Sequence, residues 1–344
     1  MKSQSFFSLS CFIFLAGGVF LPRTEPGGSA AYAVSDKGAE VFNTYSIVAC
    51  DTGNGDLGAA VQSKAFAVGA RVPYAKAGVG AIATQATTNP SFGPRGLALL
   101  EKGLSPRQVI DSLLRGDDRP AVRQLAVIDA QGSLAVHSGD SCTDWKGSRT
   151  GRYSSCQGNL LAGRQVVDSM AALFEAAPGE LAERLMSALE AGQRAGGDSR
   201  GMQSAALLVV RAGAGYGGFN DRYIDIRTDD SRNPIRELRR LLNKVMAINA
   251  ILKAETFRDK KDYTPMIELA RRAVALDPAT GYNWYQLGCY LTLADRQEEA
   301  KRALKEAFKR DDWLILAARS DSDLDNLVHD QEFRSMIGLL RTKY

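Results

Sequence analysis

The first residues that could do chemistry lie in two short runs joined by a turn. The runs read TYSIVACD, beginning at Thr44, and LGAAVQSK, ending at Lys64, with the letters TGNGD between them. Alternation with a period of two predicts β-strands, and glycine, asparagine and aspartate at the joint predict a hairpin. Thr44 and Ser46 then share one face of the first strand. A hydroxyl that opens one strand, beside a cation that closes the next, is compatible with a hydrolase core.

Length and composition limit the classes of protein to which this chain can belong. It has 344 residues, of which 45% are hydrophobic and 24% charged, so it is a globular chain with room for two domains. The net charge is only +4, and no basic block carries interleaved aromatic residues, which argues against a nucleic-acid partner. With two histidines and no paired CxxC spacing, we expect no zinc site.

The N-terminal segment has the features of a secretory signal peptide. Lys2 precedes an apolar run that serine and glycine interrupt, and Ala31-Tyr32-Ala33 forms a cleavage motif. We therefore expect residues 1–33 to be removed and the protein to be exported to the periplasm or the medium. After processing we expect no stable membrane span. Export permits disulfides, and the pair to test is Cys142 with Cys156, although two separate buried thiols fit the cysteine pattern equally well.

The order of the elements favours an α+β fold. Further strands are predicted at 79–86, 123–130, 133–139, 153–159, 203–211 and 222–227. Helices are predicted near 97–102, after the Ser105-Pro106 start signal, and at 164–175 and 178–194. Runs of strands separated by helix pairs fit a layered sandwich better than alternating βαβ units.

The composition of the chain changes near residue 235, after which strands are absent and helix formers dominate. The stretch ARRAVALDP from Ala270 returns as LKEAFKRDD from Leu304, 34 residues further on. This period resembles the tetratricopeptide repeat, a helical-repeat fold. We expect a small all-α helical-repeat domain over residues 243–344. This domain either binds a protein partner or is a structural appendage. The sequence also leaves open whether the protein forms a homo-oligomer.

Several blocks between Thr44 and Leu242 together resemble a known family. They include TYSIVACD, NPSFGPRGLALL, QGNLLAG, GGDSRGMQSAALLVV and DRYIDIR, in that order. The resemblance is to domain-of-unknown-function family 1028, which is grouped with the N-terminal-nucleophile (Ntn) hydrolases. It implies a four-layer αββα sandwich over residues 44–242 and a hydrolase without a settled substrate. Residues 34–43 are then a short pro-segment or linker.

The resemblance also implies a chemistry. In Ntn hydrolases a Thr, Ser or Cys begins a strand, and its own α-amine is the general base. The reference pKa of an α-amine is about 7.7–8.0 against about 10.4 for lysine, so the amine is partly unprotonated near neutrality. Thr44 matches the family's threonine, and Lys64 is the cation expected to disfavour protonation of that amine. No metal or organic cofactor is implied, and the substrate class is a small amide or peptide-like compound.

The remaining candidates are polar residues at strand ends and in loops. Gln85 and Asn159 are expected to support catalysis, the former at a strand end whose N–H groups could stabilise an oxyanion. The residues expected to bind substrate are Ser46, Thr84, Arg95, Asp198 and Arg200.

Each assignment has a structural alternative. Thr44 fits a strand by propensity alone, Ser46 is the alternative hydroxyl, and Lys64 could be a solvated strand end. Asn159 and Asp198 are also common turn formers. The amine of Thr44 exists only after the Asn43–Thr44 bond is cut, for which we expect self-cleavage. If the bond stays intact, the expected function is that of a non-catalytic envelope binding protein on the same scaffold.

Overall fold

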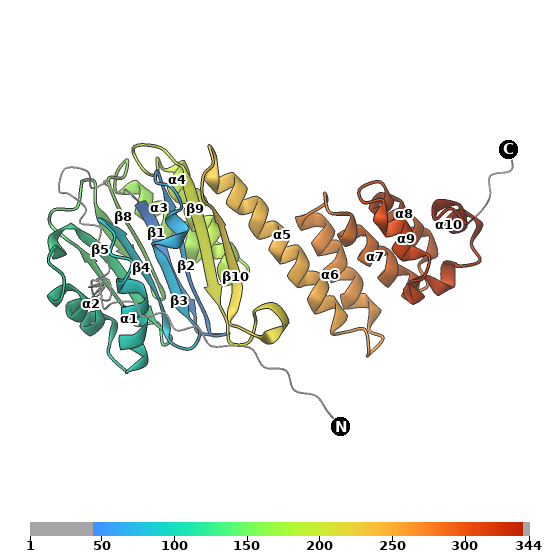
Figure 1. The fold of residues 1–344 in the computed structure, drawn as a ribbon, viewed down its shortest axis with the longest axis horizontal. Coiled ribbons are helices and arrows are strands. Elements are labelled where there is room, and N and C mark those ends of the chain that lie inside the picture. The colour runs from blue at the N-terminus through green and yellow to red at the C-terminus, as the bar shows by residue number, and fades with distance from the viewer. Residues whose placement is uncertain (1–43, 340–344) are drawn as a thin grey trace, which may run out of the picture. The chain divides into compact units, whose positions relative to one another are not determined.

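The computed structural model describes residues 44–339, and its main features are two antiparallel sheets and a series of helices (Figure 1). The predicted signal peptide, residues 1–33, and pro-segment, residues 34–43, lie outside the described residues, as does the Asn43 side of the predicted cleavage bond.

Sheet A contains the predicted hairpin at its centre. β1 (Thr44–Asp51) and β2 (Asp56–Ser63) pair antiparallel, as the alternating pattern predicts. The six strands run in the order β10-β9-β2-β1-β8-β7. The other four are β7 (Gly147–Thr150), β8 (Ser154–Asn159), β9 (Ser204–Val210) and β10 (Arg222–Thr228).

Sheet B has four strands in the order β3-β4-β5-β6. They are β3 (Pro73–Lys76), β4 (Gly80–Ala86), β5 (Arg123–Asp129) and β6 (Leu134–Ser138). β4, β5 and β6 agree with the predicted strands. β3 and β7 were not predicted, because each is only four residues long and too short for its alternation to stand out.

Helices cover the outer face of each sheet. On sheet A, α3 (Gln165–Ala176) and α4 (Leu181–Arg194) pack against Tyr45, Ile47 and Ala49 of β1. On sheet B, α1 (Phe92–Glu101) and α2 (Pro106–Arg115) pack against β4 and β5. Between the two sheets lies a separate apolar core that includes Val48, Val61, Ala83 and Ala126. These contacts confirm the predicted α+β class.

Two helix starts show how local sequence sets the elements. Ser105 caps α2 with the predicted capping box, since its hydroxyl accepts from the Gln108 N–H and the Gln108 side chain accepts from the Ser105 N–H. α1 begins at Phe92, earlier than the predicted residue 97. Its first turn contains Pro94, which a helix tolerates there but which suggested a turn in the sequence.

The described C-terminal part, from residue 234 onward, is all-helical, as predicted. It contains α5 (Pro234–Glu255), α6 (Tyr263–Leu276), α7 (Gly281–Leu293), α8 (Gln297–Phe308), α9 (Trp313–Ala318) and α10 (Gln331–Met336). The predicted boundary at residue 242 falls within α5. Leu238 and Leu242 pack in the sheet A core, whereas Ala250 and Ile251 pack with α6 to α8. Within residues 44–339, no helix is both long and apolar enough to cross a bilayer.

Candidate functional site

Thr44 lies between two polar side chains on neighbouring strands. In the register of sheet A it pairs with Ser63 of β2 on one side and with Asn159 of β8 on the other. Partners in an antiparallel register point to the same face, which here is the face toward sheet B. The Thr44 hydroxyl donates a hydrogen bond to the Ser63 hydroxyl at 3.2 Å, and all three residues are buried. A hydroxyl therefore begins the strand in a fixed, protein-lined position.

A second polar row faces this one from sheet B. Gln85 of β4 pairs with Gln124 of β5, which in turn pairs with Ser138 of β6. The Gln85 amide nitrogen donates to the Thr44 carbonyl at 3.3 Å and to Gln124 Oε1 at 2.7 Å. Its amide oxygen accepts from the Ser46 hydroxyl at 2.6 Å. Gln85 thus links the start of β1 to the opposite sheet.

Gln124 joins the two rows into one network. Its Oε1 also accepts from Asn159 Nδ2 at 3.1 Å, and its Nε2 donates to the Gly158 carbonyl and the Ser138 hydroxyl, both at 2.8 Å. On the other side, Gln157 Nε2 donates to Ser46 Oγ at 2.6 Å. We call the five connected residues Ser46, Gln85, Gln124, Gln157 and Asn159 the amide network.

The amide network interrupts a core that is otherwise apolar. Buried amides cost free energy unless they are hydrogen-bonded, and here the side chains satisfy one another across the two sheets. Polar groups in such a network hold each other in single orientations. The network therefore fixes the main chain and the neighbours of Thr44, which is the arrangement that a positioned nucleophile requires.

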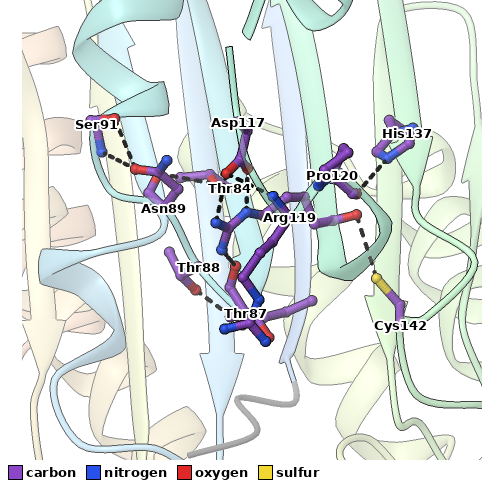
Figure 2. A network of polar contacts seen from close by, with 12 residues as sticks. Thr84, Thr87, Thr88, Asn89, Ser91, Asp117, Arg119, Pro120, His137 and Cys142 are labelled. Atoms are coloured by element: carbon purple, nitrogen blue, oxygen red, sulfur yellow. Dashed lines mark hydrogen bonds and ion pairs between the residues drawn. The ribbon is translucent and has the colours of Figure 1, made fainter. Parts of the chain in front are cut away.

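The loop after Gln85 is held by an ion pair. Arg123 donates to both carboxylate oxygens of Asp117, at 2.5 and 2.9 Å, and to the Thr87 carbonyl at 2.5 Å. Figure 2 shows Asp117 and Thr87 on opposite sides of this group of contacts. The hydrogen bond from Arg123 holds the pKa of the Asp117 carboxyl below its usual value. Thr87 follows Gln85 by two residues, so this pair steadies the end of β4.

Four of the predicted site residues come together, namely Thr44, Ser46, Gln85 and Asn159, whereas Thr84 lies elsewhere. The Thr84 hydroxyl contacts the Asn89 carbonyl on the side of sheet B that faces α1 and α2. Its backbone N–H donates to the Val72 carbonyl, so it is not directed at Thr44. Alternation along β4 places Gln85 and Thr84 on opposite faces.

The charged candidates lie outside the amide network. Lys64 is exposed, and its ammonium donates to the Met202 carbonyl at 3.5 Å. Asp198 is buried, where it accepts from the Lys64 backbone N–H at 2.9 Å and pairs with Arg200 at 3.0 Å. Arg95 is exposed on α1, 5.9 Å above the Phe92 ring, on the outer side of sheet B. Asp198 thus anchors the end of β2.

Cys142 and Cys156 are separate buried thiols, so the disulfide considered from the sequence is not formed. Cys156 faces the helices on sheet A, since it pairs with Ile47 in the register. Cys142 instead contacts the Arg123 carbonyl at 3.4 Å, next to sheet B (Figure 2). Along residues 44–339, no three His, Cys, Asp or Glu side chains are grouped in a way that could hold a metal ion.

Sequence reasoning missed Ser63, Gln124 and Ser138 as members of this site. A glutamine within a strand that is apolar on both faces is an unusual choice, and Gln124 in RQLAVID carries that signal. What the sequence does not contain is the pairing of β4 with β5, which sets Gln124 opposite Gln85.

The comparisons with known proteins decide the family. Residues 44–238 match a family of unknown function, DUF1028. The chain belongs to the DUF1028 family. The predicted family resemblance is therefore confirmed, and the matched region of this DUF1028 chain begins at Thr44. A similar solved structure is the crystal structure of protein SPO2555 from Silicibacter pomeroyi, also assigned to DUF1028. It is 30% identical in sequence, with a TM-score of 0.55, and the match covers 59% of this chain and 86% of that one. No curated protein matches the chain.

Proposed function

We propose that this DUF1028 protein is an exported Ntn-type hydrolase that cleaves a small amide or peptide-like bond with Thr44 as the nucleophile. The observation that carries the proposal is the position of Thr44: it begins the central strand of sheet A and faces a hydrogen-bonded polar network between two sheets. Buried polar networks in an apolar core are expected where function requires them.

The packing of the layers supports the Ntn part of the proposal. A helix pair on each outer face and two sheets face to face correspond to the four-layer αββα arrangement of that class. The start of the family match at Thr44 fits a family whose functional chain begins there. In this scheme residues 34–43 are removed to expose the Thr44 amine.

The proposed reaction follows an acyl-enzyme route. The α-amine of Thr44 takes the proton from Oγ1, which attacks the substrate carbonyl carbon and forms a C–O bond. The amine then gives that proton to the leaving nitrogen as the C–N bond breaks. Water, deprotonated by the same amine, hydrolyses the ester, so the acid is released and the Thr44 hydroxyl is restored.

The neighbours of Thr44 have separate tasks in this mechanism. The Ser63 hydroxyl accepts from Thr44 Oγ1 and so holds the side-chain rotamer. Asn159 lies opposite Thr44 and gives one amide hydrogen to Gln124, and in this mechanism its second amide hydrogen is the donor for a developing oxyanion. Gln85 fixes the Thr44 carbonyl and hence the direction of the amine.

The rival proposal is a non-catalytic envelope binding protein with a protein-binding helical-repeat tail. It is favoured by the two repeated stretches, which begin within α6 and α8 and extend just past their ends, and these helices hold equivalent positions in successive pairs. A tetratricopeptide-like tail would serve either function, because a hydrolase also gains from recruitment to a partner.

Intact-mass analysis of the exported protein tests the proposal. We expect a chain that begins at Thr44 and hydrolyses members of a panel of N-acyl amino acids and dipeptides. Thr44→Ala should keep its pro-segment and lose all hydrolysis, whereas Thr44→Ser should retain both processing and reduced activity. Thr52→Ala, in the exposed hairpin turn, is the matched control. A folded protein that begins at Val34, with no activity affected by Thr44→Ala, favours the binding protein.

A further inference from the structure

A polar cavity lies at the end of sheet A where β2 ends, where β9 begins and where the loop after β10 passes. Its volume is about 380 Å³, and it is lined by Lys64, Met202, Gln203, Asp230, Ser231 and Arg232. Nothing in the proposed mechanism uses this cavity. Its position and its charge nevertheless connect it to Thr44.

The backbone ties the cavity to the nucleophile. Ser63, whose hydroxyl accepts from Thr44 Oγ1, gives its carbonyl to the Gln203 N–H at 3.0 Å. The Gln203 carbonyl in turn accepts from the Ser231 N–H at 2.8 Å. Neighbouring strands lie about 4.8 Å apart, so the wall of the cavity begins within about 10 Å of the Thr44 main chain. Three backbone bonds span about 3.8 Å, so a substrate needs about eight bonds between its scissile carbonyl and a group in the cavity.

The lining of the cavity has an excess of positive charge. Lys64 and Arg232 contribute two cations, against the single carboxylate of Asp230, which Gln203 Nε2 already contacts at 3.1 Å. The bond from Lys64 Nζ to the Met202 carbonyl is long, and an ammonium has two further N–H donors. Arg232 adds a planar guanidinium suited to bidentate binding of a carboxylate. Asp198, which accepts from the Lys64 backbone N–H, is paired with Arg200.

We infer that this cavity is a subsite for a carboxylate on the substrate, so that the hydrolase acts on amides that end in an acid several bonds away, such as N-acyl ω-amino acids or N-acyl dipeptides. The inference rests on the proposed function. It gives Lys64 a role in binding the substrate in place of its predicted role beside the amine. Amides without a carboxylate would then be poor ligands.

Direct binding tests the subsite independently of turnover. In the processed chain, residues 44–344 with Thr44→Ala and no pro-segment, we would measure by calorimetry the affinity for N-acetyl-ω-amino acids, from N-acetylglycine to N-acetyl-8-aminooctanoic acid, and for the matching terminal amides. We expect the acids to bind at least tenfold more tightly than the amides, and that preference to shrink with added salt. Lys64→Gln with Arg232→Gln should remove most of it. Lys102→Gln with Arg115→Gln, two exposed cations at the ends of α1 and α2, should leave it unchanged.

The outcomes separate this inference from the proposed function. If the variant prefers the acids through Lys64 and Arg232 but the wild-type protein hydrolyses none of them, the subsite is supported and the hydrolase is contradicted. Hydrolysis by the wild-type protein without that preference contradicts the subsite alone. The absence of preference at every chain length, including the absence of any binding, overturns the inference.

Discussion

Gln124 accepts two hydrogen bonds with one oxygen, from Gln85 and from Asn159, and both of those residues contact or flank Thr44. Gln124→Leu keeps the volume but takes this acceptor from two buried amide groups, of which Gln85 keeps its bond to the Thr44 carbonyl. We expect a loss of about 1–3 kcal/mol of unfolding free energy, the cost of one unsatisfied buried group, that of Asn159. Urea denaturation measures it. Gln131→Leu, in an exposed turn, is the control, and an equal loss there would contradict the role of the network.

The cysteines of the described region are predicted to be unreactive. Burial raises the pKa of Cys50 to about 11 and raises the pKa values of Cys142, Cys156 and Cys289 as well, and the thiolate is the reactive form. We expect iodoacetamide at pH 7.5 to modify none of these four in the native protein and all four in denaturant, as read by mass spectrometry. An intact mass of the native protein that is lower by two hydrogens, and that returns to the full value after denaturation in reductant, would instead show the disulfide.

At the scale of elements, the Asp117–Arg123 pair should make the end of β4 sensitive to acid. The pKa of Asp117 is lowered in the folded protein, so its contribution is fully present above its ordinary value of 3.8 and is lost as pH falls through the folded value. Asp117→Asn should therefore be less stable than wild type by about 1.5–3 kcal/mol at pH 7, the contribution of a charged hydrogen bond.

The stability gap between wild type and Asp117→Asn should close as the pH falls below 3.8, as followed by thermal unfolding at several pH values. Asp118→Asn, which changes an exposed neighbour, should show no such convergence. A gap that stays constant with pH would mean that the ion pair is not the cause.

The sequence predicts the elements better than it predicts the site. The hairpin of β1 and β2 follows from alternation and turn residues, which are local. Thr44 and Asn159 lie at strand ends, and Ser46 shares a face with Thr44, all of which follows from the sequence. The orientation of the Lys64 side chain depends on a contact with the Met202 carbonyl, which lies in a loop far along the chain. The place of Gln124 depends on the pairing of β4 with β5, and no local pattern encodes either of these contacts.

Over the whole molecule, α5 supplies residues to two hydrophobic cores. Leu238 is 0% exposed in the sheet A core, whereas Leu252 on the same helix is 62% exposed. Leu238→Ala should lower the unfolding free energy by about 2–5 kcal/mol, because it leaves a cavity. Leu252→Ala should change it by no more than about 0.5 kcal/mol. Chemical denaturation compares them, and similar losses would argue against the packing of α5 on sheet A.

The hydroxyls and amides around Thr44 include no side chain that gains or loses a charge between mild acid and mild alkali. In the proposed mechanism, pH then alters the chemistry at Thr44 mainly through the α-amine that cleavage of the Asn43–Thr44 bond exposes. The rate of hydrolysis should rise along a single limb with a midpoint near or below about pH 8 and then level off, without the falling alkaline limb of an enzyme that uses two titrating side chains.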